Sequence, residues 1–541
     1  MTGGSNAARR MTVGEGIVEH LLAEGVDTVF GIPGAHMYDL NDAMARAGGK
    51  LRFVTARHEQ GAAWMAYGYA QATGKPGVFT VVPGPGVLNA GAALCTAYAA
   101  NAPVLCLTGN VMSHLIGQGR GQLHELPDQL GTLAGITRHA ARIDHPAEVS
   151  SVMHGAFHAM KNGRGGPAAV EAPWDVFGKA GMVDAPRVAD RQTPAIDPEA
   201  LAEAAAMVAG AKRPLIMVGG GAMNAGAEIA ALAEKIGAPV TCHRSGKGVI
   251  PADHPMAMDS IAAYEYWREC DLLIGIGSRL EMQFMRWSWK PAGLKMLRID
   301  MDPTEFVRLR PDLGLLADAA EGAAALAGAC GQAEDRSAEV AALVKDSQAK
   351  AGTVQPQADW LDAIRAALPR DGILVEEICQ AGFAARFRWP AYTPRSYISC
   401  GYQETLGFGY GTALGAKAGR PDLPVVSING DGGFMFAVQE LATAVHEGLN
   451  VVAVVFDNGQ YGNVRRDQDM RYEGRRIGSE LGNPDFVAMA KAFGVHAEEA
   501  DAAGLEEAVA RCIAMERPCL IRVQGGDEGS PWPFTMPAPH S

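Results

Sequence analysis

The chain has 541 residues, of which 48% are hydrophobic and 20% charged, and its formal net charge is −13 at pH 7. This length exceeds what one hydrophobic core supports, so it predicts about three domains of a soluble globular protein. The negative charge argues against nucleic acid or an anionic membrane as a partner, and no apolar run is long enough to span a bilayer. Nine cysteines without paired spacing favour reduced thiols in a cytoplasmic protein.

Strands alternate with helices through the first third of the chain. The first ten residues predict a loose tail, and helical spacing of apolar residues follows over 12–22. Short apolar runs that lead into turns predict strands at 29–34, 51–55, 78–82, 103–108 and 167–173. This alternation predicts a doubly wound parallel sheet in a domain spanning residues 1–180. The stretch 177–198, rich in Pro, Ala and Asp, predicts a linker.

The middle of the chain repeats the pattern and predicts a second α/β domain at residues 198–331. Its strands are expected at 213–218, 239–242, 272–275 and 297–300. The turn Gly219–Gly221 can cradle a nucleotide, although one glycine turn after a strand is a weak signal. Residues 315–353 are Ala-rich with interspersed charge and predict a helix followed by a linker.

The third domain, residues 355–541, contains the most informative stretch. After a predicted helix at 360–368 and a strand at 373–375, residues 425–428 predict a buried strand that breaks at Asn429-Gly-Asp-Gly-Gly433. A helix is expected over 437–446, with Gly448 as its C-cap, and a second strand over 451–456. This βαβ unit places polar side chains at the carboxyl ends of two strands, where open α/β sheets bind ligands.

Asp431 and Asn458 are the candidate metal ligands of this unit. One carboxylate, one amide oxygen and a free backbone carbonyl suit a hard octahedral cation that bridges phosphates, such as Mg²⁺. The glycine-rich turn and the helix N-terminus suit the phosphates themselves.

Glu59 is the candidate acid of the first domain. It stands at the mouth of a predicted strand and is followed by the small residues Gly61 to Ala63. Burial there would raise the pKa of its carboxyl group and let it share a proton with a heterocycle nitrogen. A single Glu at a helix start is more often a solvated charge, so both interpretations stay open on the residues alone.

Three motifs together resemble one family. Arg57-His-Glu-Gln-Gly-Ala-Ala63 with the Gly-Tyr-Ala that follows, Gly84-Pro-Gly-x-x-Asn89, and Gly430-Asp-Gly followed by Asn458 are similar to the thiamine diphosphate-dependent acetohydroxyacid synthase (acetolactate synthase) and benzaldehyde lyase family. The resemblance covers nearly the whole chain. It implies an α/β fold of three doubly wound parallel-sheet domains: pyrimidine-binding, middle (FAD- or nucleotide-binding-like) and diphosphate-binding.

The resemblance also implies roles for individual residues. Glu59 would contact N1′ of the aminopyrimidine and drive ylide formation, while Asp431, Asn458 and the carbonyl of Gln460 would hold Mg²⁺ against thiamine diphosphate. Asp457 departs mildly from the family, which usually has Asn there. The other residues that would contact the cofactor are Pro83, Asn89, Glu404, Leu406, Gly430, Gly432, Gly433, Tyr461 and Gly462.

The glycine-rich segment Ser399–Ala416 is a poor helix former, which favours close packing against a ligand or another helix. By resemblance, Leu406 would force the cofactor into its bent conformation, and the carbonyl of Glu404 would accept from the 4′-amino group. Relatives usually have Gly at the position of Glu404. Its carboxylate either tunes substrate choice or points away, and the sequence leaves both open.

Two histidines are further catalytic candidates. His36, in Gly34-Ala-His36, matches a benzaldehyde lyase histidine that assists proton transfer, although a backbone-bonded histidine at a helix start is an alternative. His124 stands where both groups of relatives carry Gln, so its imidazole would change the proton traffic unless it is structural. We expect one or both to protonate reaction intermediates.

The function predicted by resemblance is an acetolactate-synthase-like decarboxylase and carboligase that acts on a 2-oxo acid. The alternative is a benzaldehyde-lyase-like 2-hydroxy ketone lyase or a diketone hydrolase, which His36 favours. A paralogue that binds the cofactor without turnover is the least favoured, because Glu59, Asp431 and Asn458 are all present. The substrate would be a small carbonyl compound.

The resemblance also bears on FAD and on assembly. Acetohydroxyacid synthases bind FAD through a Gly-Met-His-Gly segment, whose glycines are missing from Asp253 to Tyr264, and this argues against FAD. Because Glu59 and Asp431 serve one cofactor from different subunits in this family, we expect a homodimer or homotetramer with active sites between subunits. The proline-rich tail 530–539 is not expected to be helical; it either covers the site or is disordered.

Overall fold

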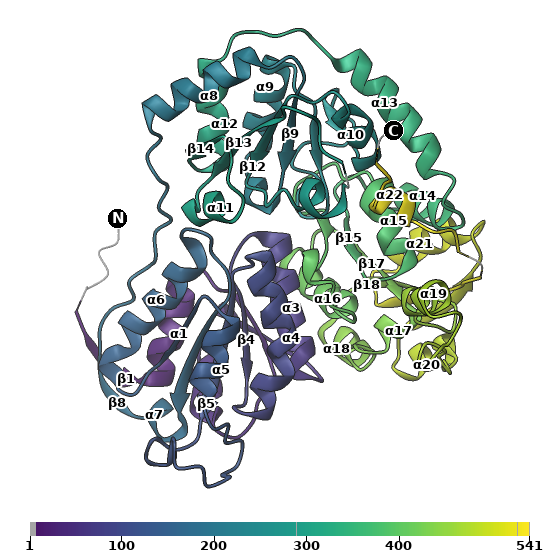
Figure 1. The fold of residues 1–541 in the computed structure, drawn as a ribbon. Coiled ribbons are helices and arrows are strands. Elements are labelled where there is room, and N and C mark those ends of the chain that lie inside the picture. Colours follow the sequence, from purple (N-terminus) through teal and green to yellow (C-terminus); the bar gives the residue numbers. More distant parts are fainter. Residues whose placement is uncertain (1–6, 288, 527, 540–541) are drawn as a thin grey trace.

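The computed structural model describes residues 7–287, 289–526 and 528–539, which form three α/β units (Figure 1). Each unit contains one six-stranded sheet in which every described strand pairing is parallel. Neighbouring residues of a strand point into different buried clusters, as Val29 and Phe30 do, so both faces of the sheet are covered. The predicted fold class is confirmed.

The first unit has the strand order β3-β2-β4-β5-β7-β6. Its strands are β2 (Thr28–Gly31), β3 (Arg52–Thr55), β4 (Gly77–Val81), β5 (Val104–Asn110), β6 (His139–Arg142) and β7 (Ala168–Pro173). Its helices are α1 (Val13–Ala23), α2 (Tyr38–Arg46), α3 (Glu59–Thr73), α4 (Pro85–Ala100), α5 (Gln129–Ile136), α6 (Val149–Lys161) and α7 (Trp174–Phe177).

The third unit has the order β16-β15-β17-β18-β20-β19, which is the topology of the first unit. Its strands are β15 (Ile373–Glu376), β16 (Tyr397–Ile398), β17 (Val425–Gly430), β18 (Val451–Asp457), β19 (His496–Ala500) and β20 (Cys519–Gln524). Its helices are α14 (Gln357–Ala367), α15 (Gln380–Arg388), α16 (Gly409–Gly419), α17 (Asp431–Phe434), α18 (Glu440–Glu447), α19 (Gly462–Arg471), α20 (Phe486–Ala492), α21 (Leu505–Ala514) and α22 (Trp532–Thr535).

The middle unit lies at the top of Figure 1 and has the order β11-β10-β9-β12-β13-β14. Its strands are β9 (Pro214–Val218), β10 (Val240–Cys242), β11 (Ala257–Met258), β12 (Leu272–Ile276), β13 (Lys295–Asp300) and β14 (Leu313–Leu316). Its helices are α8 (Pro198–Gly210), α9 (Gly226–Ile236), α10 (Ser260–Trp267), α11 (Pro303–Arg308) and α12 (Ala319–Ala329), and α13 (Ser337–Ala351) leads to the third unit.

The first and third units share one hydrophobic core through α3 and α16. Glycines set the close approach of these helices: a Cβ on Gly68 would lie 1.9 Å from the Thr412 carbonyl oxygen, and one on Gly415 1.8 Å from the Met65 carbonyl oxygen. The expectation that the glycine-rich segment packs tightly is therefore confirmed, and its partner is a helix.

Four stretches differ from the sequence-based expectation. Within the predicted N-terminal tail, whose residues 1–6 lie outside the described part, β1 (Arg9–Thr12) begins and pairs antiparallel with β8 (Ala180–Val183) of the predicted linker. Both segments are only four residues long, so their pairing was invisible to local patterns. The predicted linker after residue 330 contains α13, and the proline-rich tail contains the helical turn α22. Proline is compatible with a helix only in its first turn, where Pro533 stands.

Among the described residues, no helix combines the length and the apolar character that crossing a membrane requires.

Candidate active site

A cavity of about 170 Å³ opens at the carboxyl ends of β17 and β18, close to the segment that follows β15. Since the strand order reverses beside β15, this is the edge where parallel sheets bind ligands. Nine of the residues that the resemblance assigned to the cofactor line it: Leu406, Gly430, Asp431, Gly432, Gly433, Asn458, Gln460, Tyr461 and Gly462.

The Asp431 carboxylate is buried and fixed on both oxygens. Oδ1 accepts a hydrogen bond from the Gly432 N–H at 2.8 Å, and Oδ2 accepts from the Gly459 N–H and from Asn483 Nδ2, each at 2.7 Å. Asn483 also donates to Asp457 Oδ1 at 2.7 Å, while Arg522 pairs with Asp457 at 2.8 Å. The carboxylate therefore has one fixed orientation at the cavity wall.

Asn458 is oriented by a residue of the C-terminal segment. Its Nδ2 donates to Glu528 Oε1 at 3.0 Å, so the amide oxygen is turned to the other side. Burial raises the pKa of Glu528 to about 7 against the lowering effect of this hydrogen bond, and the Asp431 charge adds to the rise. Two carboxyl groups and an amide oxygen thus meet at one wall of the cavity.

These residues fit a diphosphate accompanied by a divalent cation. The side-chain donors that meet there are oxygens, which hard cations prefer. Gly432 lets the Tyr461 ring pack closely against this turn, because a Cβ there would lie 2.4 Å from the ring. The cavity lies at the N-terminus of α17, whose residues Asp431, Gly432 and Gly433 line it.

Glu59 lies in the first unit, at the start of α3, and is grouped with Asn89 rather than with the residues that line the Asp431 cavity. Asn89 Nδ2 donates to Glu59 Oε2 at 3.0 Å, and Oε1 accepts no hydrogen bond from the described residues. Pro83 precedes the tight turn at Gly84, where φ is +58°, and Asn89 lies in the second turn of α4. Among the described residues, the lining of the Asp431 cavity does not include Glu59 or Asn89.

His36 and His124 meet at the same end of the first sheet. Their Nδ1 atoms are 3.4 Å apart, and the His36 ring packs on Trp174 with ring centres 4.6 Å apart. Both histidines have left-handed backbones, with φ of +73° and +61°, a conformation that side chains other than Gly rarely adopt. Burial lowers the pKa of His36, and the nearby His124 lowers it further. Both effects favour the neutral form of the His36 imidazole.

The side chain of Glu404 points away from the cavity. Its carboxylate accepts from Arg244 Nη1 at 2.7 Å and from Arg386 Nη2 at 2.9 Å, and Arg286 lies at 3.5 Å. Burial alone would raise the pKa of Glu404, but Arg386 and Arg244 outweigh it and lower the pKa to about 2. Of the two alternatives left open by the sequence, the second is correct: the carboxylate joins the middle and third units.

We expect Glu404→Gln to lower the free energy of unfolding at pH 7 by about 3 kcal/mol, because the buried Arg244 loses its carboxylate partner and the buried Arg386 keeps only Glu376, 2.7 Å away. The folded pKa lies below the ordinary value of 4.5, so the stabilisation is complete above that pH and is lost as the pH falls toward about 2. Urea unfolding of both proteins between pH 8 and pH 4 checks this: the difference should be constant above pH 5 and shrink below pH 4.5. A difference below 0.5 kcal/mol (roughly the size of a surface effect) would contradict it.

Sequence reasoning missed several residues that hold the site. Gln129 on α5 accepts from the Gly84 N–H at 2.8 Å and donates to the Gly109 carbonyl at 2.7 Å, so it ties together two strand ends. Three other residues act in a similar way. Asn483 donates to Asp431, and Glu528 accepts from Asn458. Glu440 accepts from the backbone of His58, the residue before Glu59. None of them stands in a motif or at a strand end, so no local signal could have found them.

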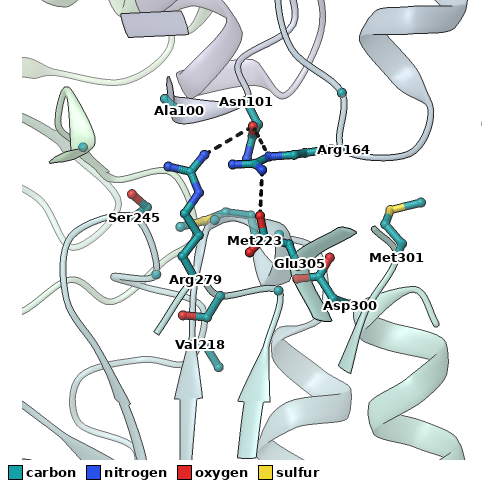
Figure 2. Close-up of a pocket in the computed structure, with 18 of the residues that line it drawn as sticks. Ala100, Asn101, Arg164, Val218, Met223, Ser245, Arg279, Asp300, Met301 and Glu305 are labelled. Atoms are coloured by element: carbon teal, nitrogen blue, oxygen red, sulfur yellow. Dashed lines mark hydrogen bonds and ion pairs between the residues drawn. The ribbon is translucent and has the colours of Figure 1, made fainter. Parts of the chain in front are cut away.

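A larger cavity of about 640 Å³ lies where the three units meet. Figure 2 shows Arg164 and Arg279 reaching across it toward Asn101, and the ion pair of 2.7 Å between Arg164 and Glu305. The turn Gly219–Gly221 and Asp300, whose pKa burial raises to about 6, supply features typical of nucleotide sites.

The same cavity does not reproduce the flavin site implied by the resemblance. Among the described residues, none between 247 and 276 lines it, and this interval includes the segment 253–264 that would hold FAD in the synthases. The residues present therefore do not fit FAD in that manner, and the argument against FAD remains a prediction.

The fold and the cavity at the ends of β17 and β18 define a cofactor enzyme of the α/β class with two sheets of equal topology. Three family models match the chain: the N-terminal thiamine pyrophosphate (diphosphate)-binding domain at residues 11–132, the central domain of these enzymes at 201–326, and the C-terminal thiamine pyrophosphate-binding domain at 377–523.

Relatives match over nearly the full length. A protein described as a probable 2-ketoarginine decarboxylase of Pseudomonas aeruginosa is 35% identical, over 90% of this chain and 89% of its own. A probable acetolactate synthase large subunit of Methanocaldococcus jannaschii is 33% identical over 94% and 91%, and the large subunit of Escherichia coli acetolactate synthase isozyme 1 is 31% identical over 99% and 98%. The chain belongs to the thiamine pyrophosphate enzyme family and is a thiamine diphosphate-dependent enzyme.

Proposed function

We propose that this enzyme is an acetolactate-synthase-like decarboxylase and carboligase that acts on a small 2-oxo acid with thiamine diphosphate and Mg²⁺. The observation that carries the proposal is the cavity at the ends of β17 and β18, where Asp431, Asn458 and the glycine turn converge in a chain related over its whole length to synthases and a decarboxylase. We propose domain limits of 1–180, 198–331 and 355–541, and a cytoplasmic location.

Asp431, Asn458 and the carbonyl of Gln460 would hold Mg²⁺, and the glycine turn would bind the diphosphate. When bound, thiamine diphosphate supplies a carbon nucleophile and an electron sink for breaking or making a C–C bond. Glu59 would present Oε1 to the aminopyrimidine, since Oε2 already accepts a hydrogen bond from Asn89. Leu406 would force the cofactor into its bent conformation, and the Glu404 carbonyl would accept a hydrogen bond from its 4′-amino group.

Active sites would form between two subunits of a homodimer or homotetramer. The proposal is supported by the separation of the two groups of residues, because the Asp431 cavity is lined without Glu59 among the described residues. Asn89 and the neighbouring Leu88, which is 55% exposed, lie open beside Glu59, where a partner subunit would cover them.

The His36–His124 pair would move protons at the substrate side of the site. A neutral His36 can accept a proton and pass it to His124 through their facing Nδ1 atoms. This pair is the observation that favours the alternative, a 2-hydroxy ketone lyase. The named relatives, which are synthases and a decarboxylase, favour the first function.

A substrate panel tests the proposal. The purified protein with thiamine diphosphate and Mg²⁺ would be given pyruvate, 2-ketoarginine or benzoin, and CO₂ and carbonyl products would be quantified. We expect CO₂ from at least one of the two 2-oxo acids, and replacing His36 by Gln should lower that rate. Cleavage of benzoin without CO₂ from either acid would assign the protein to the lyase alternative.

A further inference from the structure

The helix α18 connects the diphosphate-site unit to the residues that present Glu59. It is the crossover helix between β17 and β18, the strands whose ends carry Asp431 and Asn458. Its first residue, Glu440, has no exposed surface, and its carboxylate is directed into the first unit. Oε1 accepts from the His58 N–H at 3.0 Å and the Arg57 N–H at 3.2 Å.

Residues of both α18 and α3 hold the Glu440 carboxylate in this position. Thr443, one turn along α18, donates its hydroxyl to Glu440 Oε2 at 2.6 Å and thereby fixes the rotamer. On the other side, Gly61 leaves the space that the carboxylate fills, since a Cβ there would lie 2.2 Å from Glu440 Oε1. A side chain at Gly61, in the first turn of α3, would therefore displace the Glu440 carboxylate.

The same face of α18 also contacts β3, the strand that precedes α3. Glu447, seven residues after Glu440, accepts from the Thr55 N–H at 2.8 Å and its carbonyl accepts from Arg52 at 3.0 Å. Two helical turns thus hold β3 at one end and the start of α3 at the other. The last residues held are Arg57 and His58, and Glu59 is the next residue in the chain.

We propose that Glu440 is a positioning residue for Glu59: it fixes the backbone from which the catalytic carboxyl group is presented to the cofactor. This rests on the proposed role of Glu59. Because Glu59 would face the cofactor of a partner subunit, α18 would also join the metal site of one active centre to the acid of another. A buried carboxylate with backbone N–H donors from a different unit is a rigid connection, since losing it leaves those donors unpaired.

The test compares Glu440→Gln with Glu447→Gln, the same change on the same helix face. A glutamine at 447 keeps an acceptor for Thr55 and loses only the ion pair of 3.4 Å with the exposed Arg52. A glutamine at 440 offers a single acceptor oxygen and places its NH₂ group against N–H donors or Thr443. We expect Glu440→Gln to lower kcat about 10- to 100-fold, as for a misplacement near 1 Å, with KM and the affinity for thiamine diphosphate within about threefold of the parent. Glu447→Gln should change kcat less than about threefold.

A second readout does not depend on turnover. In the cofactor-free protein, amide hydrogen exchange of residues 52–64 should rise in Glu440→Gln, while exchange over 425–434 stays at the parent level. The double variant Glu59→Gln with Glu440→Gln should have the same residual activity as Glu59→Gln alone, because Glu440 acts through Glu59. Full kcat in Glu440→Gln, or equal losses in both single variants, would overturn the inference. Retained activity of Glu59→Gln alone would instead remove the proposed function.

Discussion

Glu59→Gln is expected to lower the rate of 2-oxo acid turnover by at least about 1,000-fold while the protein still binds thiamine diphosphate and Mg²⁺. The amide keeps the size of the side chain and can still face Asn89, but it cannot hold or release a proton for the aminopyrimidine. The diphosphate and the metal are held by residues of the third unit, so the affinity for the cofactor should change less than about tenfold. Steady-state rates and calorimetric titration of the cofactor measure the two effects separately.

The matched control is Glu125→Gln, an acid in the loop beside His124 that caps the Gln122 N–H at 2.9 Å. A glutamine keeps an acceptor there, so we expect activity within about threefold of the parent. Turnover by Glu59→Gln above a tenth of the parental rate would contradict the assignment of the acid.

Asp431→Asn is expected to abolish Mg²⁺-dependent binding of thiamine diphosphate, with a loss of affinity of at least about 100-fold. The substitution removes the full negative charge from the wall where Asn458 and Glu528 also converge, and an amide offers only one oxygen. Calorimetric titration of thiamine diphosphate with and without added Mg²⁺ measures this loss of affinity. In the parent, removal of Mg²⁺ with a chelator should have the same effect as the substitution.

Asp457→Asn provides the comparison for Asp431→Asn. Asp457 stands one residue before Asn458 and pairs with Arg522 and Asn483, so its carboxylate is directed away from the cavity wall. The family resemblance places Asn at this position. We expect a loss of cofactor affinity below about fivefold, and equal losses for both substitutions would contradict a specific metal role for Asp431.

Much of the fold followed from local patterns because its strands are buried on both faces. The runs at 425–428 and 451–456 are apolar without alternation and end in glycine-containing turns, and the structure has β17 and β18 there. Gly448 has the left-handed conformation expected of a C-cap, at φ +64°. Asp431 and Asn458, the proposed metal ligands, follow β17 and β18 directly, and for the same reason their position at the strand ends was predictable.

What could not be predicted depends on pairs of residues far apart in the chain. The strand β1 exists only because β8 lies beside it, with Arg9 paired to Val183, 174 residues later in the chain. Glu404 was ambiguous because its partners Arg244 and Arg286 belong to another unit. Glu440 and Glu528 lie in ordinary helix and tail sequence, so their contacts with the Glu59 and Asn458 regions become visible only in three dimensions.

The measurement that tests the central claim most directly is the stoichiometry of pyruvate turnover by the purified protein, with thiamine diphosphate and Mg²⁺ each added or omitted. Pyruvate consumption, CO₂ and acetolactate would be quantified in one reaction. We expect two pyruvates consumed for each CO₂ and acetolactate formed, with no turnover when either cofactor is omitted after stripping. Turnover that persists without thiamine diphosphate, or no decarboxylation of either pyruvate or 2-ketoarginine with both cofactors present, would contradict the account of a synthase-like enzyme.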